Sequence, residues 1–182
     1  MIERYKVYAA LDGELEYQIA RWAHELQTPV SDYDKKVGDF LSYIIGYNAD
    51  LVYSISHVGQ NKALDVFRKL GALCVACLEI NGSFTRHING SVRNFQGGQL
   101  ERKEIYKIID SERIYQDELW DDQKHTLEGY IVLFQYFVNR AQTAWVTVPN
   151  KEYTLDVIRE LAAIAVHAME DYGVVSREPF EV

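Results

Sequence analysis

Two stretches of the chain carry the same polar and aromatic side chains at the same spacing. They contain Glu14, Tyr17, Gln18 and Trp22 in the first stretch and Glu112, Tyr115, Gln116 and Trp120 in the second. In each stretch the glutamine follows the glutamate by four residues and the tryptophan follows it by eight, so a helix would present all three on one face. That face could bind a nucleobase, because an indole stacks on a planar ring and an amide hydrogen-bonds to the edge of the ring.

The same stripe also has a purely structural interpretation. A tryptophan on an amphipathic helix can face the core, and a neighbouring glutamate can cap a helix or form an ion pair. Both interpretations stay open at the level of sequence.

The duplication extends far beyond this stripe. The run Leu64-Asp65-Val66-x-Arg68 recurs as Leu155-Asp156-Val157-x-Arg159, and each copy is followed by a glycine, Gly82 or Gly173. Agreement at both ends of the unit predicts a tandem pair of helical units related by a pseudo-two-fold axis, with a pocket between them. Arg68 and Arg159 could contact phosphates in that pocket, or they could form simple ion pairs with the aspartates three residues earlier.

The elements that must position these residues are helices. Apolar residues recur at helical spacing, and Pro29, Gly59 and Pro149 interrupt the pattern. Predicted helices cover residues 2–26, 37–57, 62–80, 101–120, 127–145 and 153–172. The predicted fold is an all-α helical bundle with a first unit at 1–82, a linker or lid at 83–100, a second unit at 101–173 and a tail at 174–182. The linker is rich in Ser, Asn and Gly and carries Arg86.

Composition narrows the class of protein. The chain has 182 residues and a formal net charge of −8, which disfavours binding to duplex nucleic acid. It has no apolar stretch long enough to span a bilayer and no signal-peptide pattern, so a cytoplasmic location without membrane contact is expected. Cys74 and Cys77 lie in an apolar helical run and are expected to be small core residues in a reducing compartment.

The motif Glu112-Arg-Ile-Tyr-Gln-Asp-Glu-Leu-Trp120, followed by Arg159-Glu-Leu-Ala-Ala-Ile-Ala-Val166 and Glu170, resembles the MazG-like proteins of bacteriophages. These belong to the all-α nucleoside triphosphate pyrophosphohydrolases. The resemblance covers both halves of the chain. It implies cleavage of nucleoside triphosphates to monophosphate and pyrophosphate, and Mg²⁺ held by Glu-Glu-x-x-Glu on one helix and Glu-x-x-Asp on the next. It also implies a homo-oligomer.

The sequence departs from that metal-binding pattern. Residues 130–141 contain no carboxylate, and the counterpart at 40–50 offers only Asp50 at its end. Glu160 is present, but Ala163 stands where the paired aspartate would be; the first half has Lys69 and Ala72 at these two places. Mg²⁺ requires several oxygen ligands, so the usual metal site is missing.

Three functions follow from these observations. The first is a nucleotide-binding protein that does not hydrolyse its ligand and needs no cofactor, in which Trp22, Trp120 and tyrosines stack on the base while Arg68, Arg86 and Arg159 contact phosphates. A phage protein of this kind could sequester a nucleotide or a nucleotide signal of host defence in the host cytoplasm. The second is a Mg²⁺-dependent pyrophosphohydrolase with a rearranged set of ligands, Glu14, Glu79, Glu112 and Glu170. The third is a structural or interaction protein.

Overall fold

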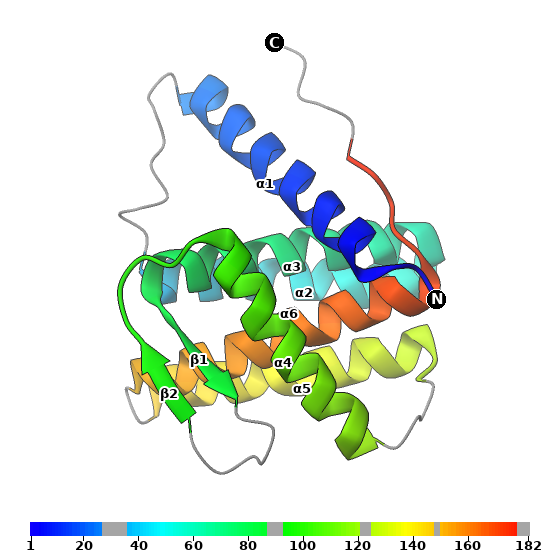
Figure 1. Cartoon of the computed structure of the whole chain (residues 1–182). Helices are drawn as coiled ribbons and strands as arrows, with labels where there is room; N and C mark the ends of the chain where they lie inside the picture. The colour runs from blue at the N-terminus through cyan, green and yellow to red at the C-terminus, as the bar shows by residue number, and fades with distance from the viewer. Residues whose placement is uncertain (27–35, 87–92, 121–124, 148–149, 178–182) are drawn as a thin grey trace.

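The computed structural model describes residues 1–26, 36–86, 93–120, 125–147 and 150–177, except for the side chains of 22–26, 93 and 94. These parts form six helices and a two-stranded sheet (Figure 1). The elements are α1 (Arg4–Leu26), α2 (Val37–His57), α3 (Gln60–Asn81), β1 (Ser83–Arg86), β2 (Arg93–Gln96), α4 (Arg102–Trp120), α5 (Leu127–Val146) and α6 (Lys151–Tyr172). The prediction of an all-α helical bundle is confirmed, with small shifts at the helix ends.

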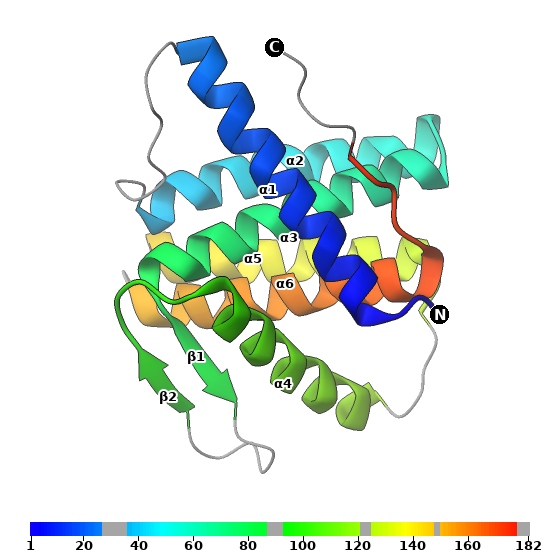
Figure 2. The same ribbon diagram turned by 45° about the horizontal axis from the view of Figure 1, so that its top comes forward.

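The helices pack in three layers. The central pair, α3 and α6, is covered by α2 and α5 on one face, while α1 and α4 cross the other face (Figures 1 and 2). Small side chains let the central helices approach closely. A Cβ atom on Gly71 would lie 3.5 Å from Ala165 Cβ and only 2.9 Å from Leu11 Cδ2, so this position accepts no larger residue without a shift in its neighbours.

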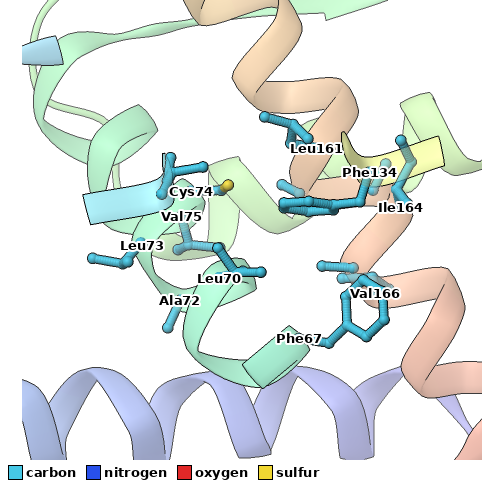
Figure 3. Close-up of a cluster of buried hydrophobic side chains, with 14 of the residues drawn as sticks. Phe67, Leu70, Ala72, Leu73, Cys74, Val75, Phe134, Leu161, Ile164 and Val166 are labelled. Carbon is cyan, nitrogen blue, oxygen red and sulfur yellow. The ribbon is translucent and has the colours of Figure 1, made fainter. Parts of the chain in front are cut away.

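The hydrophobic core lies along both central helices and continues onto α5 (Figure 3). Phe67 of α3 and Phe134 of α5 meet edge to face, with ring centroids 5.8 Å apart. Nearly every residue from Ala63 to Leu78 is buried because α3 is covered on several sides. Cys74 and Cys77 lie within this run, and both are buried and free of disulfides, as their apolar surroundings predicted.

Local sequence signals explain where the helices begin and end. Thr126 caps α5 by accepting a hydrogen bond from Gly129 N, and Asn150 caps α6 by accepting one from Tyr153 N. Gly82 and Gly173 end α3 and α6 with φ angles of 89° and 108°, which favour glycine.

A hairpin follows α3, inside the segment predicted to be a linker or lid. Its strands pair antiparallel, with Ser83 opposite Gln96 and Arg86 opposite Arg93, and β1 packs against α4 and α6. That this segment moves as a lid stays a prediction.

Contacts between the halves occur in equivalent pairs. Arg4 forms an ion pair with Asp110 (3.2 Å), and Arg102 forms one with Asp12 (3.3 Å). The two arginines are equivalent residues 98 positions apart in the chain, and so are the two aspartates. This reciprocal pattern is typical of a pseudo-two-fold relation. The description of each half as a MazG-like unit stays a prediction.

Candidate functional site

The predicted glutamate–glutamine stripe is buried in both halves. Glu14 and Glu112 are each 1% exposed, and each accepts a hydrogen bond from the glutamine one turn later. The distance from nitrogen to oxygen is 2.9 Å for Gln18 and 3.5 Å for Gln116. Both stripes face the third helix of their own half, so the carboxylates need a cationic partner there.

That partner is the arginine predicted on the third helix. Arg68 Nε donates to Glu14 Oε2 at 2.9 Å, and Arg159 Nε donates to Glu112 Oε2 at 3.1 Å. Each arginine also pairs with the aspartate three residues earlier, Asp65 or Asp156. Both guanidinium groups are almost fully buried, and three different groups pair with each of them.

The third group is a backbone carbonyl. For each arginine it comes from the segment that follows the third helix of the other half. Arg159 Nη1 donates to the Phe84 carbonyl at 3.0 Å, and Arg68 Nη1 donates to the Val175 carbonyl. Each carbonyl belongs to the second residue after the glycine that ends a third helix. The chain after α6 therefore repeats the path of β1 after α3.

A second arginine follows two residues later on each path. Arg86 lies over the ring of Tyr115, with Cζ 3.9 Å from the centroid, and Arg86 Nε donates to Glu112 Oε2 at 2.6 Å. Arg177 lies over the ring of Tyr17 at 3.5 Å, with Nε 3.8 Å from Glu14 Oε2. Arg177 was not among the predicted site residues, although it lies as many residues after Gly173 as Arg86 lies after Gly82.

We define two clusters from these contacts. The first cluster consists of Glu14, Lys62, Asp65, Arg68, Lys69 and Arg177, and the second of Arg86, Glu112, Arg140, Asp156, Arg159 and Glu160. Four charged positions are shared between them, whereas Lys69 of the first cluster corresponds to Glu160 of the second. Lys62 corresponds to Tyr153, and Arg140 corresponds to Asp50. Glu160 accepts from Arg86 Nη2 at 3.0 Å and from Arg140 Nη1 at 3.2 Å, whereas Lys69 pairs with Asp65 at 3.0 Å.

The two clusters consequently carry different charges. Three arginines balance three carboxylates in the second cluster, while four cations face only two carboxylates in the first. Arg21 and Asp50 add one charge of each sign near the first cluster, since both act on the phenol of Tyr47. A surplus of two positive charges therefore gathers at the first cluster, in a protein whose net charge is −8.

The pKa shifts agree with this difference. Burial alone would raise the pKa of Asp65, but hydrogen bonds and charge from Lys69, Lys62 and Arg68 outweigh it and lower that pKa. In the second cluster, burial followed by repulsion from Glu112 raises the pKa of Glu160 despite its arginine partners. The cations of the first cluster thus favour the ionised form of a carboxyl group, whereas the second cluster disfavours the ionised form of Glu160.

Two tyrosine rings border the first cluster. Tyr17 lies under Arg177, and Lys69 Nζ is 5.8 Å from the centroid of Tyr47. Burial, followed by the charge of Glu14, raises the pKa of Tyr47, so its phenol stays neutral at physiological pH. The site therefore combines cations with flat aromatic rings.

The predicted site residues therefore form two sets rather than one shared pocket. Tyr8 and Tyr106 stack where α1 meets α4. The Trp120 indole meets His125 edge to face at 5.3 Å and packs against the core, while the Trp22 side chain lies outside the described part.

The four carboxylates suggested as alternative metal ligands are all bound to arginines. Glu14 and Glu112 belong to the two clusters, Glu79 pairs with Arg102, and Glu170 pairs with Arg4 and Arg113. Within the described ranges, no three His, Cys, Asp or Glu side chains are grouped so that they could hold a metal ion. Arginine guanidinium groups therefore neutralise these four carboxylates in the place where a bound metal ion would do so.

Comparison with known proteins adds no assignment. Neither the family models, nor the curated proteins, nor the solved structures include a match to this chain. Among the helices in the described ranges, none combines the length and the apolarity needed to cross a bilayer. The functional interpretation therefore rests on the charges and contacts of the two clusters.

Proposed function

We propose that the protein binds a nucleotide at the first cluster and does not hydrolyse it. The observation that carries this proposal is the difference in charge between the two related ionic clusters, above all the presence of Lys69 where the second cluster has Glu160. In the first cluster four cations share two carboxylates, beside two tyrosine rings. Phosphate groups are the common biological anions that need such charge, and bases are the common planar groups that need such rings.

The cations divide into buried and accessible ones. Arg68 is 1% exposed and fully engaged, so it orders the carboxylates rather than reaching a phosphate. The side chains of Lys62, Lys69 and Arg177 are 45%, 16% and 23% exposed. These three would contact the phosphates, and two surplus charges suit a diphosphate or triphosphate better than an uncharged nucleoside.

Binding without hydrolysis follows from the state of the carboxylates. A pyrophosphohydrolase uses its acids to hold Mg²⁺, which polarises the phosphate and activates water. Here Glu14 and Asp65 already bind guanidinium and ammonium groups, and displacing Arg68 would leave a buried charge without a partner, at a cost of about 3–5 kcal/mol. A binder of this kind would act by holding its ligand, which agrees with sequestration of a nucleotide signal by a phage protein.

The test measures binding and turnover separately. Isothermal titration with the four common nucleoside triphosphates and their monophosphates, in EDTA, should give binding that is tighter for the triphosphates. Lys69→Gln should weaken it about five- to tenfold, the value of one charge-assisted contact. Lys107→Gln, an exposed lysine on α4, is the matched control and should bind like the wild type. Absence of binding by every nucleotide would refute the proposal.

Turnover distinguishes this function from the enzymatic alternative. With Mg²⁺ present, the purified protein should release no pyrophosphate from any of the four triphosphates above the blank. Release of pyrophosphate that disappears in Glu112→Gln, while the variant stays folded by circular dichroism, would establish a pyrophosphohydrolase instead.

A further inference from the structure

A cavity of about 500 Å³ lies in the second half, between the later part of α5 and the beginning of α6. Six of the side chains that line it are Tyr136, Asn139, Arg140, Thr143, Asn150 and Tyr153. Its volume falls in the range of small-molecule sites. None of these residues belongs to the first cluster, so the cavity is separate from the proposed nucleotide site.

The guanidinium of Arg140 is held within this cavity by aromatic rings. Its Cζ atom lies 4.9 Å from the ring centroid of Phe137, 5.9 Å from that of Tyr136 and 5.8 Å from that of Tyr153. Arg140 Nη2 also donates to Tyr153 Oη at 2.7 Å. Such a guanidinium is already oriented for a ligand, so binding orders little further.

Arg140 keeps donors for a ligand. A guanidinium has five N–H groups. Within the described residues, Arg140 donates one hydrogen bond to Glu160 and one to Tyr153, so the other N–H groups remain for a ligand. Its side chain is 30% exposed, which leaves an edge open to the cavity. Because Glu160 already offsets part of its charge, the cavity suits one further negative charge and not the several of a polyphosphate.

The residues that build the cavity are not a product of the duplication. The buried positions of α2, from Val37 to Ser54, all recur 90 residues later on α5, from Leu127 to Ala144. At the same spacing, Gly46 stands where α5 has Tyr136, and Asp50 stands where it has Arg140. Packing is conserved between the two helices, while the exposed residues that build the cavity are not.

We propose that this cavity binds a planar aromatic molecule with a single negative charge, of the class of the aromatic carboxylates. The carboxylate would take the free donors of Arg140 in a bidentate pair. The ring would lie against the tyrosines, and the amide of Asn139 and the hydroxyl of Thr143 would bind polar substituents.

The experiment compares two probes of nearly the same shape, 2-naphthoate and 2-naphthamide, by ligand-observed NMR titration at pH 7. The anion should bind at least tenfold more tightly than the neutral amide. Arg140→Met should remove this difference and leave the affinity for the amide nearly unchanged. Equal affinity of the two probes for the wild type, or an unchanged preference in Arg140→Met, would overturn the proposal.

Two further variants complete the test. Tyr136 is 58% exposed, so Tyr136→Ala should fold normally and weaken both probes by a similar factor, and unchanged binding in this variant would also overturn the proposal. Lys69→Gln should bind both probes like the wild type. A parallel loss of naphthoate and nucleotide binding in Lys69→Gln would show that the cavity is not an independent site.

Discussion

The phenol rings of Tyr8 and Tyr106 stack face to face between α1 and α4, with centroids 4.0 Å apart and an interplanar angle of 11°. Each hydroxyl donates at 2.6 Å to an aspartate of the other half, from Tyr8 to Asp110 and from Tyr106 to Asp12. Burial, followed by the neighbouring aspartate, raises the pKa of both phenols. The pair therefore stays protonated and joins the halves by reciprocal bonds.

Removing these hydroxyls should weaken the association of the halves. Tyr8→Phe and Tyr106→Phe each keep the stacked ring and lose one bond to a carboxylate that is partly exposed, so each should lower the free energy of unfolding by about 1 kcal/mol. Urea denaturation measures this change. Tyr5→Phe, on an exposed position of α1, is the control and should differ from the wild type by less than about 0.5 kcal/mol.

The second cluster should be intolerant of losing its central carboxylate. Glu112 is 1% exposed and binds both Arg159 and Arg86, so Glu112→Gln removes the carboxylate that two buried guanidinium groups share and leaves their positive charge only partly neutralised. The free energy of unfolding should fall by about 3 kcal/mol or more. Glu118→Gln, an exposed position on the same helix, should have almost no effect. Equal stability of the two variants would mean that the cluster contributes no net stabilisation.

His167 should make the fold sensitive to acid. Burial, followed by repulsion from Arg113, lowers its pKa from 6.5 to about 4. Between these two values the unfolded chain binds more protons than the folded one, so stability should fall as the pH drops from 6.5 towards 4. His167→Gln should remove up to about 2 kcal/mol of this loss, as measured by urea titrations at pH 7 and pH 4.5. A variant with the same pH profile as the wild type would contradict the assignment.

The two cysteines should be chemically silent in the folded protein. Both are fully buried, and burial raises the pKa of each thiol, so thiolate is scarce at neutral pH. Ellman's reagent should therefore react with neither thiol in native buffer and with both in urea. Rapid stoichiometric reaction under native conditions would show that the α3 core opens.

Local patterns in the sequence were enough to predict the helices and the glutamate and arginine at the centre of each cluster. The bounds of α2, Val37–His57, follow from apolar periodicity between breakers, and the link between Glu14 and Gln18 follows from helical spacing. The contact of Arg177 with Tyr17 joins residues far apart in the chain, so periodicity could not reveal it. The spacing of Arg177 from Gly173 was the only local signal.

Other features escaped because they belong to one half only. A search for repeated residues finds what the halves share, whereas Tyr136 and Arg140 have no counterparts at Gly46 and Asp50. The strands of the hairpin were missed for a different reason. They contain four residues each, with a single phenylalanine among polar residues, and short strands acquire stability only from the surface against which they pack.

The chain follows matching paths after α3 and after α6. Non-covalent contacts between α6 and α1 therefore take the place that the covalent connection has between α3 and α4. Leu100 N donates to the Glu79 carbonyl where the hairpin returns to α4, and Ile2 N donates to the Glu170 carbonyl where the chain enters α1. The hairpin is thus a covalent version of a junction that, between α6 and α1, is held by non-covalent contacts such as this hydrogen bond and the ion pair of Arg4 with Glu170. A circularly permuted chain, closed by a linker between its present ends and opened at the hairpin, should reach the same packing.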